Sequence, residues 1–164
     1  MSSDLLQRKT AAFVPWRPGH TNPPPQLVIG RFQPGNPSGF VDQQRFDLRA
    51  APVSADLWEL PAAECNLVDG RVYHYWFEVS DTNPYRDHGP TPARILCTDP
   101  TAWSVDWRLR APRPAGTYSE DDRDPAAVVK FEGGQLIPCD PGGEIADFGG
   151  DADPATLPPN NRLA

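Results

Sequence analysis

The chain has 164 residues, the usual size of one domain, and can form a hydrophobic core without disulfides or metals. Its 21 prolines and 13 glycines leave few stretches that could run as long helices, so short strands and many turns are expected. The formal net charge of −7 argues against nucleic acid and acidic membranes as partners, because both require clustered basic residues.

The first half of the chain contains three runs typical of strands. The apolar pattern begins at Phe13, and the run LVIGRF at residues 27–32 follows a proline-rich turn. Residues 40–49, FVDQQRFDLR, alternate imperfectly between apolar and polar side chains, and DLWELP follows at residues 56–61. Each run is short and ends at turn residues, which favours strands over helices.

The clearest strand signal is RVYHYWFEV at residues 71–79, entered through the turn pair Asp-Gly. A period of two places Tyr73, Tyr75 and Phe77 on one face, which we expect to be core. The same period places His74, Trp76 and Glu78 on the opposite face. We expect these three residues to form an outward surface that contacts either a carbohydrate or a neighbouring domain.

The second half of the chain completes a sandwich. ARILCT at residues 93–98 predicts another strand, and a Gly-Gly turn at residues 133–134 predicts a hairpin between AAVVKF and QLIPC. We therefore expect an all-β sandwich of about seven strands over residues 13–138. Residues 139–164 are rich in Gly, Pro and Asp and predict an irregular linker.

Nothing in the sequence has the spacing of a catalytic or metal site. The three histidines, His20, His74 and His88, match no metal-binding pattern, and no GxSxG nucleophile accompanies them. The acidic run SEDDRD at residues 119–124 is more typical of a solvated loop than of a calcium site. We expect no catalytic residue, no metal and no cofactor.

The N-terminal sequence and the spacing of the cysteines predict the cellular compartment and the state of the thiols. The N-terminus has no apolar signal-like stretch and no apolar run reaches membrane length, so we expect a cytoplasmic protein. Cys65, Cys97 and Cys139 form no CxxC pair and are expected to be buried free thiols.

The five tryptophans, at positions 16, 58, 76, 103 and 107, are the feature of the composition that suggests ligand binding. Indole stacks on the apolar faces of sugars and at protein interfaces, but it is also common in sandwich cores. For each single tryptophan the core is the expected place, with Trp76 as the exception because of its strand parity.

The succession LVIGRF, DLWELP, DGRVYHYWFEV and ARILCTDPTAW resembles the N-terminal early-set, immunoglobulin-like domain of glycoside hydrolase family 13 enzymes. That domain is often classed with carbohydrate-binding module family 48 and occurs in pullulanases, branching enzymes and related amylases. The resemblance covers residues 13–138, and the closing PPNNRL at residues 158–163 resembles the approach to the first strand of the catalytic barrel.

The resemblance implies a non-catalytic module that packs against a C-terminal (β/α)8 catalytic domain of the same polypeptide and contributes to α-glucan contact. It also implies glucan-binding roles for His74 and Trp76, although PGNPSGF stands where the family has an asparagine-tryptophan pair. Two alternatives stay open: a stand-alone α-glucan-binding module, and an unrelated sandwich used for protein–protein recognition.

Overall fold

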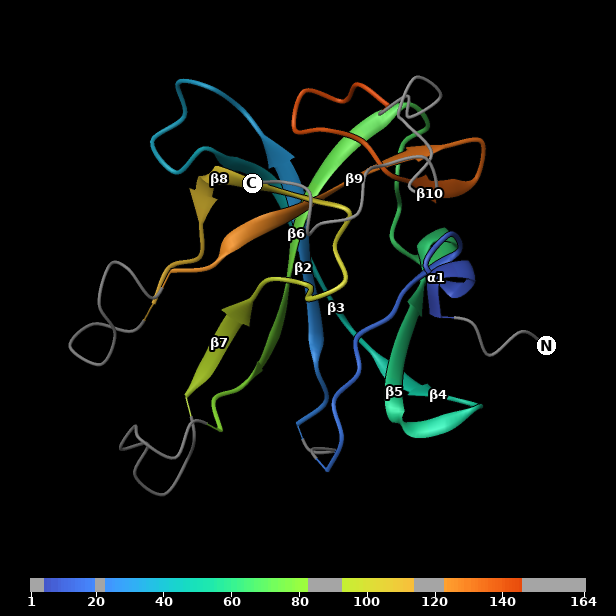
Figure 1. The fold of residues 1–164 in the computed structure, drawn as a ribbon. Coiled ribbons are helices and arrows are strands. Elements are labelled where there is room, and N and C mark those ends of the chain that lie inside the picture. The colour runs from blue at the N-terminus through green and yellow to red at the C-terminus, as the bar shows by residue number, and fades with distance from the viewer. Residues whose placement is uncertain (1–4, 20–22, 83–92, 114–122, 146–164) are drawn as a thin grey trace, which may run out of the picture.

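The computed structural model describes residues 5–19, 23–82, 93–113 and 123–145 of the chain. These residues form two antiparallel β-sheets, one of seven strands and one of three, with a single short α-helix near the N-terminus (Figure 1). The expectation of an all-β sandwich is confirmed.

The larger sheet is built around β6, its longest strand. Its order is β10-β9-β6-β2-β3, and β7 and β8 are additional partners of β6 and β9. The seven strands are β2 (Gln26–Phe32), β3 (Phe40–Asp47), β6 (Arg71–Ser80), β7 (Arg94–Cys97), β8 (Ser104–Arg110), β9 (Pro125–Glu132) and β10 (Gln135–Ile137). One flank of β6 pairs with β2, and the other pairs with β9 and then β7, so β6 lies inside the sheet along most of its length.

The smaller sheet has the order β1-β5-β4. Its strands are β1 (Ala12–Phe13), β4 (Arg49–Ala51) and β5 (Ser54–Pro61), and a 3-10 turn, η1 (Ala62–Glu64), follows β5. The helix α1 (Leu5–Arg8) precedes β1, and the backbone NH of Leu136 on β10 donates to the carbonyl of Thr10. The packed structure therefore begins upstream of Phe13.

The expected strands all appear close to their predicted bounds, but the structure describes ten strands rather than about seven. Two of the three strands that the sequence did not predict, β1 and β4, are only two and three residues long, and such pieces carry no periodic signal. The predicted hairpin is confirmed: β9 pairs with β10 across Gly133 and Gly134, which have φ of 61° and 78°. The third strand that the sequence did not predict is β8, where three charged residues in SVDWRLR obscure the alternation.

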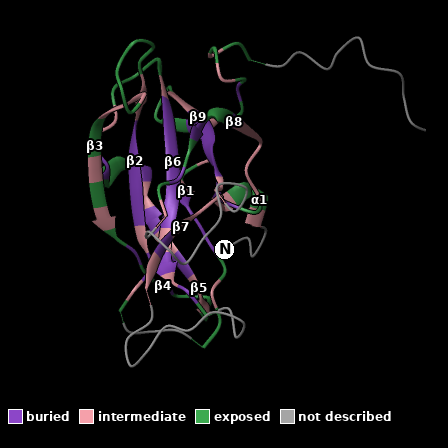
Figure 2. Cartoon of the chain, turned by 90° about the vertical axis from the view of Figure 1, so that its left-hand side faces the viewer, coloured by how far each residue is buried: buried purple, intermediate pink, exposed green. Residues whose placement is uncertain are grey.

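The main core lies between the two sheets. Tyr73, Tyr75 and Phe77 of β6 face the smaller sheet, as the period of two predicts, and pack with side chains of β1 and β5. The ring of Phe13 meets the ring of Tyr75 edge to face at 5.0 Å. Figure 2 shows β2 and β6 as almost continuously buried strands, whereas β3 at the edge is largely exposed.

A buried polar cluster lies at one side of this core. Asp99 accepts a hydrogen bond from the hydroxyl of Tyr75 at 2.7 Å and others from the backbone NH and hydroxyl of Thr101. The ammonium of Lys9 lies 3.5 Å from the same carboxylate and 4.8 Å from the ring centre of Trp103. Burial lowers the pKa of Lys9, and Asp99 opposes that shift. The cluster attaches the N-terminal segment to the sandwich.

The far face of the larger sheet carries a second, smaller core. Trp76, Leu109, Ala111 and Ala126 are buried there, packed against Phe32, Phe40 and Leu96. Gly30 makes this possible, because a Cβ on Gly30 would lie 2.6 Å from the ring of Phe40 and from the carbonyl of Val41. A glycine within β2 therefore leaves room for the ring of Phe40 on this face of the sheet.

The predicted linker begins within the described part of the chain, but most of it, residues 146–164, lies outside the described residues. Cys139, just after β10, is buried, and the carboxylate of Asp140 accepts a hydrogen bond from the backbone NH of Glu144. Residues 139–145 thus form a turn with one buried side chain. The role of the remaining residues as a linker stays a prediction.

We expect Lys9→Met to destabilise the fold by about 3–5 kcal/mol, because it leaves the Asp99 carboxylate buried without its ammonium partner. Urea unfolding of the variant and of the wild type measures the difference. The matched control is Lys130→Met, which removes a 3.7 Å ion pair with the half-exposed Glu132 and should cost no more than about 1 kcal/mol. Equal urea midpoints for Lys9→Met and the wild type would contradict the role assigned to the cluster.

Candidate functional site

The three residues predicted to form an outward surface share the far face of β6, but two of them are buried within this chain. His74 and Trp76 each expose only 2% of their surface. The parity of the strand is therefore as predicted, whereas the expected exposure of His74 and Trp76 is wrong. The prediction requires the second face of the sheet to be open to solvent. In the structure, side chains of β3 and β8 cover that face around Trp76.

Trp76 is covered by segments that lie far from it in the sequence. The ring of Phe40, at the start of β3, meets the indole edge to face at 5.3 Å, and Leu109 of β8 packs in the same cluster. The indole NH donates to the backbone carbonyl of Asp124 at 3.2 Å. Both the apolar and the polar parts of the side chain are satisfied inside the domain.

His74 belongs to a polar row with Asp106 and Arg108, in which His74 and Asp106 are buried and Arg108 is exposed. Its Nε2 lies 2.9 Å from Asp106, and the guanidinium of Arg108 donates to the same carboxylate at 2.7 Å and stacks over Phe32 at 4.0 Å. Burial would raise the pKa of Asp106, but the hydrogen bonds from Arg108 and His74 outweigh it and lower that pKa to about 2. Because the carboxylate can only accept, Nε2 of His74 is the protonated nitrogen.

Burial lowers the pKa of His74, so its imidazole is neutral at neutral pH. Its second ring nitrogen, Nδ1, has no hydrogen-bond partner among the described residues. His74 therefore fixes Asp106 and, through it, Arg108, and it presents no surface to a ligand.

Glu78 is the most accessible of the three predicted residues, with 15% of its side chain exposed. Its carboxylate pairs with Arg45 of β3 and lies 3.7 Å from Nε of Arg94 on β7. One partner thus comes from the adjacent strand β7 and the other from β3, which lies beyond β2.

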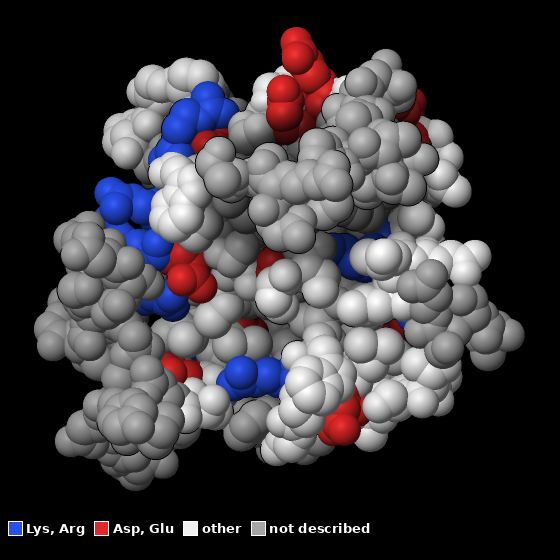
Figure 3. Space-filling model, viewed as in Figure 1, with Lys and Arg blue, Asp and Glu red and all other residues white. Residues whose placement is uncertain are grey.

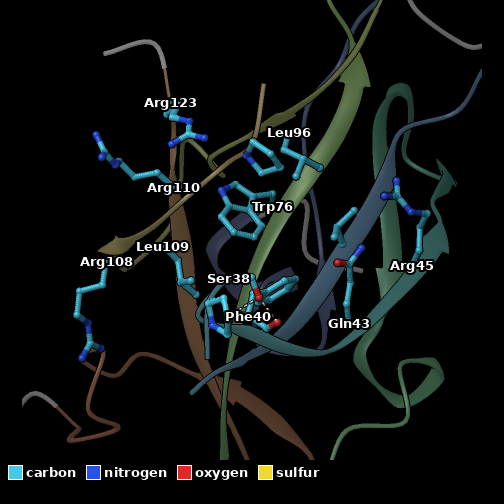
Figure 4. Close-up of a pocket in the computed structure, with 13 residues that line it drawn as sticks. Ser38, Phe40, Gln43, Arg45, Trp76, Leu96, Arg108, Leu109, Arg110 and Arg123 are labelled. Atoms are coloured by element: carbon cyan, nitrogen blue, oxygen red, sulfur yellow. Dashed lines mark hydrogen bonds between the residues drawn. The ribbon is translucent and has the colours of Figure 1, made fainter. Parts of the chain in front are cut away.

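A pocket of about 530 Å³ lies on this far face, beside the buried indole of Trp76. Figure 4 shows the side chains of β3, β6, β7 and β8 around it, with Trp76 at the centre. Four arginines contribute to its lining: Arg45, Arg108, Arg110 and Arg123. In the space-filling view basic side chains gather on the side where Figure 1 places β8 (Figure 3). We call this feature the arginine pocket.

Trp16 and Trp107, which the sequence predicts to lie in the core, are exposed in the structure. Trp16 exposes 67% of its surface and Trp107 exposes 66%, whereas Trp58 is buried and Trp103 packs against the main core. The charged residues on either side of Trp107, in the sequence DWR, indicate an exposed position. Because the sequence did not predict β8, the face of the strand on which Trp107 lies could not be predicted. Exposed indoles are typical of contact surfaces.

The three cysteines are free, as expected, and two of them, Cys65 and Cys139, are buried, while Cys97 is half-buried. Burial raises the pKa of Cys65 to about 12 and that of Cys139 to about 11, so both are unreactive thiols at neutral pH. Within the described ranges, no group of three or more His, Cys, Asp or Glu residues is arranged to hold a metal ion. The other two histidines, His20 and His88, and most of the acidic run, residues 119–122, lie outside the described residues.

Comparisons with family models, curated proteins and solved structures found no match for this chain. Among the described residues, no helix has the length and apolar character needed to cross a membrane.

We expect Trp76→Ala to destabilise the domain by about 3–5 kcal/mol, because it empties part of a packed cluster. Trp107→Ala is the matched control and should change the free energy of unfolding by less than about 0.5 kcal/mol, since its indole is already exposed. Thermal or urea unfolding of the two variants measures the contrast. A Trp76→Ala variant as stable as Trp107→Ala would show that the far face is open.

We expect the His74 row to make stability depend on pH. The unfolded chain binds a proton on this histidine near pH 6.5, and the folded chain binds it only at lower pH, so stability is lost as pH falls below about 6.5. Urea midpoints at pH 7.5 and 5.0 should fall less in His74→Gln, which keeps a donor for Asp106, than in the wild type. The same drop in both proteins would exclude His74 as its source.

Proposed function

We propose that this chain is the non-catalytic N-terminal module of an α-glucan-active glycoside hydrolase and that it packs against the (β/α)8 catalytic domain of the same polypeptide. The all-β sandwich is the fold that the resemblance implies for such a module, with the aromatic strand β6 at its centre. On this proposal the residues that make contact are not His74 and Trp76, because these are buried within the domain.

The observation that carries the proposal is the exposure of Trp107 on an edge strand. Among the described strands, β8 pairs only with β9, so its other edge has no strand partner in the described part of the chain. Exposed strand edges are normally protected, and an indole beside one is well suited to be covered by another domain. Trp16, which bridges to Leu57 of the smaller sheet, supplies a second exposed indole.

The same two indoles support the second candidate, a stand-alone α-glucan-binding module. An exposed indole offers a flat apolar face on which a glucose ring can stack, with a contribution of about 1 kcal/mol by analogy with aromatic pairs. Such binding would need no catalytic group from this chain. The two candidates differ in whether the tryptophans meet protein or sugar, which an experiment can separate.

The test begins with the coding sequence downstream of residue 164, which should encode a glycoside hydrolase barrel. The barrel and the 164-residue chain, expressed separately, should associate, and Trp107→Ala should weaken that association by about tenfold or more, as expected for a central indole. Val53→Ala is the control, because Val53 is also exposed but lies in the turn between β4 and β5. The isolated chain should release no reducing sugar from starch, pullulan or glycogen.

Three results would contradict the proposal: a coding sequence that encodes no barrel, wild-type chain that does not bind the barrel, or equal binding by wild type and Trp107→Ala. Titration with maltoheptaose addresses the second candidate. Saturable binding to the isolated chain that is lost in Trp107→Ala or Trp16→Ala would favour the glucan-binding module. Hydrolysis by the isolated chain would contradict both.

A further inference from the structure

The arginine pocket has the size of a site for a small ligand. Its volume of about 530 Å³ lies within the range of roughly 300–1,000 Å³ that is usual for such sites. It lies on the far face of the larger sheet, and the proposed contacts of Trp107 and Trp16 do not involve its lining residues. An inference about the pocket is therefore independent of the proposed function.

The lining of the pocket is strongly basic in a chain that is acidic as a whole. Among the described residues that line it, four are arginines and none is Asp or Glu, although the chain has a net charge of −7. Arg45 forms an ion pair with Glu78 and Arg108 forms one with Asp106, and neither acidic residue lines the pocket. Arg110 is exposed and has no ion-pair partner in the described part of the chain. Within the described part of the chain, the charge of Arg110 in the pocket is therefore uncompensated.

The arginines reach the pocket from opposite sides. Arg45 pairs across the sheet with Val28, and Val28 with Trp76, so these three side chains form one row on the same face. Arg110 and Arg123 come from the other side, at the end of β8 and just before β9, and Figure 4 shows them across the indole from Arg45. An anion bound between the two sides would meet guanidinium groups from both.

Between the arginines the lining is apolar. Phe40 and Leu96 are half-buried and contribute side chains to the pocket, beside the nearly buried indole edge of Trp76. Pro37 and Pro112 are exposed at its border. Such a lining accommodates a ring or another compact organic body, whereas a bare inorganic ion would leave it without a partner.

We infer that the arginine pocket binds a small organic phosphate, a phosphomonoester carried on a ring of the size of a hexose or a nucleoside. Planar guanidinium groups match phosphate oxygens with paired, charge-assisted hydrogen bonds, and several of them together favour a doubly charged group over a carboxylate. The ring lies against the apolar part of the lining. Arg110 is the central binding residue, because its charge is not already compensated by another residue of the described chain.

Isothermal titration of the 164-residue chain at low salt tests this inference with four probes: glucose 6-phosphate, AMP, inorganic phosphate and maltose. We expect saturable binding of at least one phosphomonoester, weaker binding of inorganic phosphate and no binding of maltose at this pocket. The preference between glucose 6-phosphate and AMP identifies the ring, and either preference supports the inference.

Arg110→Gln should weaken binding of the preferred phosphomonoester by about tenfold or more, because it removes a charge-assisted pair. Arg71→Gln is the matched control: Arg71 is also an exposed arginine of a strand, it does not line the pocket, and its loss changes the net charge equally. The control should bind as the wild type does. Equal weakening in the two variants, binding of inorganic phosphate as tight as that of the esters, or no binding of any phosphate would overturn the inference.

Discussion

The central strand β6 has to bury aromatic side chains on both of its faces, and this requirement organises the rest of the molecule. Tyr73, Tyr75 and Phe77 need the smaller sheet as a cover, while Trp76 needs a second cover on the far face. The start of β3 and the end of β8 provide that second cover. The structure is thus a two-sheet sandwich with an additional small core outside it.

Each face of β6 also carries one buried carboxylate that ties a distant segment to the strand. Asp99 joins Tyr75 to Lys9 of the N-terminal segment, and Asp106 joins His74 to Arg108 of β8. Buried polar groups of this kind are costly unless every partner is in place, so they fix the positions of these segments as well as adding stability. The position of β8 in turn places Arg110 and the exposed Trp107.

The two candidate contact surfaces have different physical origins. Trp107 lies on the edge strand β8 and offers an indole to a large partner or a sugar, whereas the arginine pocket is a recess that can enclose a small anion. The pocket lies beside Trp76, between lining side chains of β3 and of β8. The cover that buries the predicted binding residues therefore also creates a site that the strand parity of β6 did not indicate.

The sequence by itself determined the fold class, most strand positions and the two-sided parity of β6, because these depend on local alternation, turn residues and proline content. It did not determine which tryptophans are exposed. Trp76 is buried and Trp107 is exposed because of contacts of β6 with β3 and β8, which are not its neighbours in the sequence. The one local trace of that packing is Gly30, whose missing side chain admits the ring of Phe40. Burial on the second face of a strand is a property of the assembled sheet, so only the tertiary structure decided where the candidate sites lie.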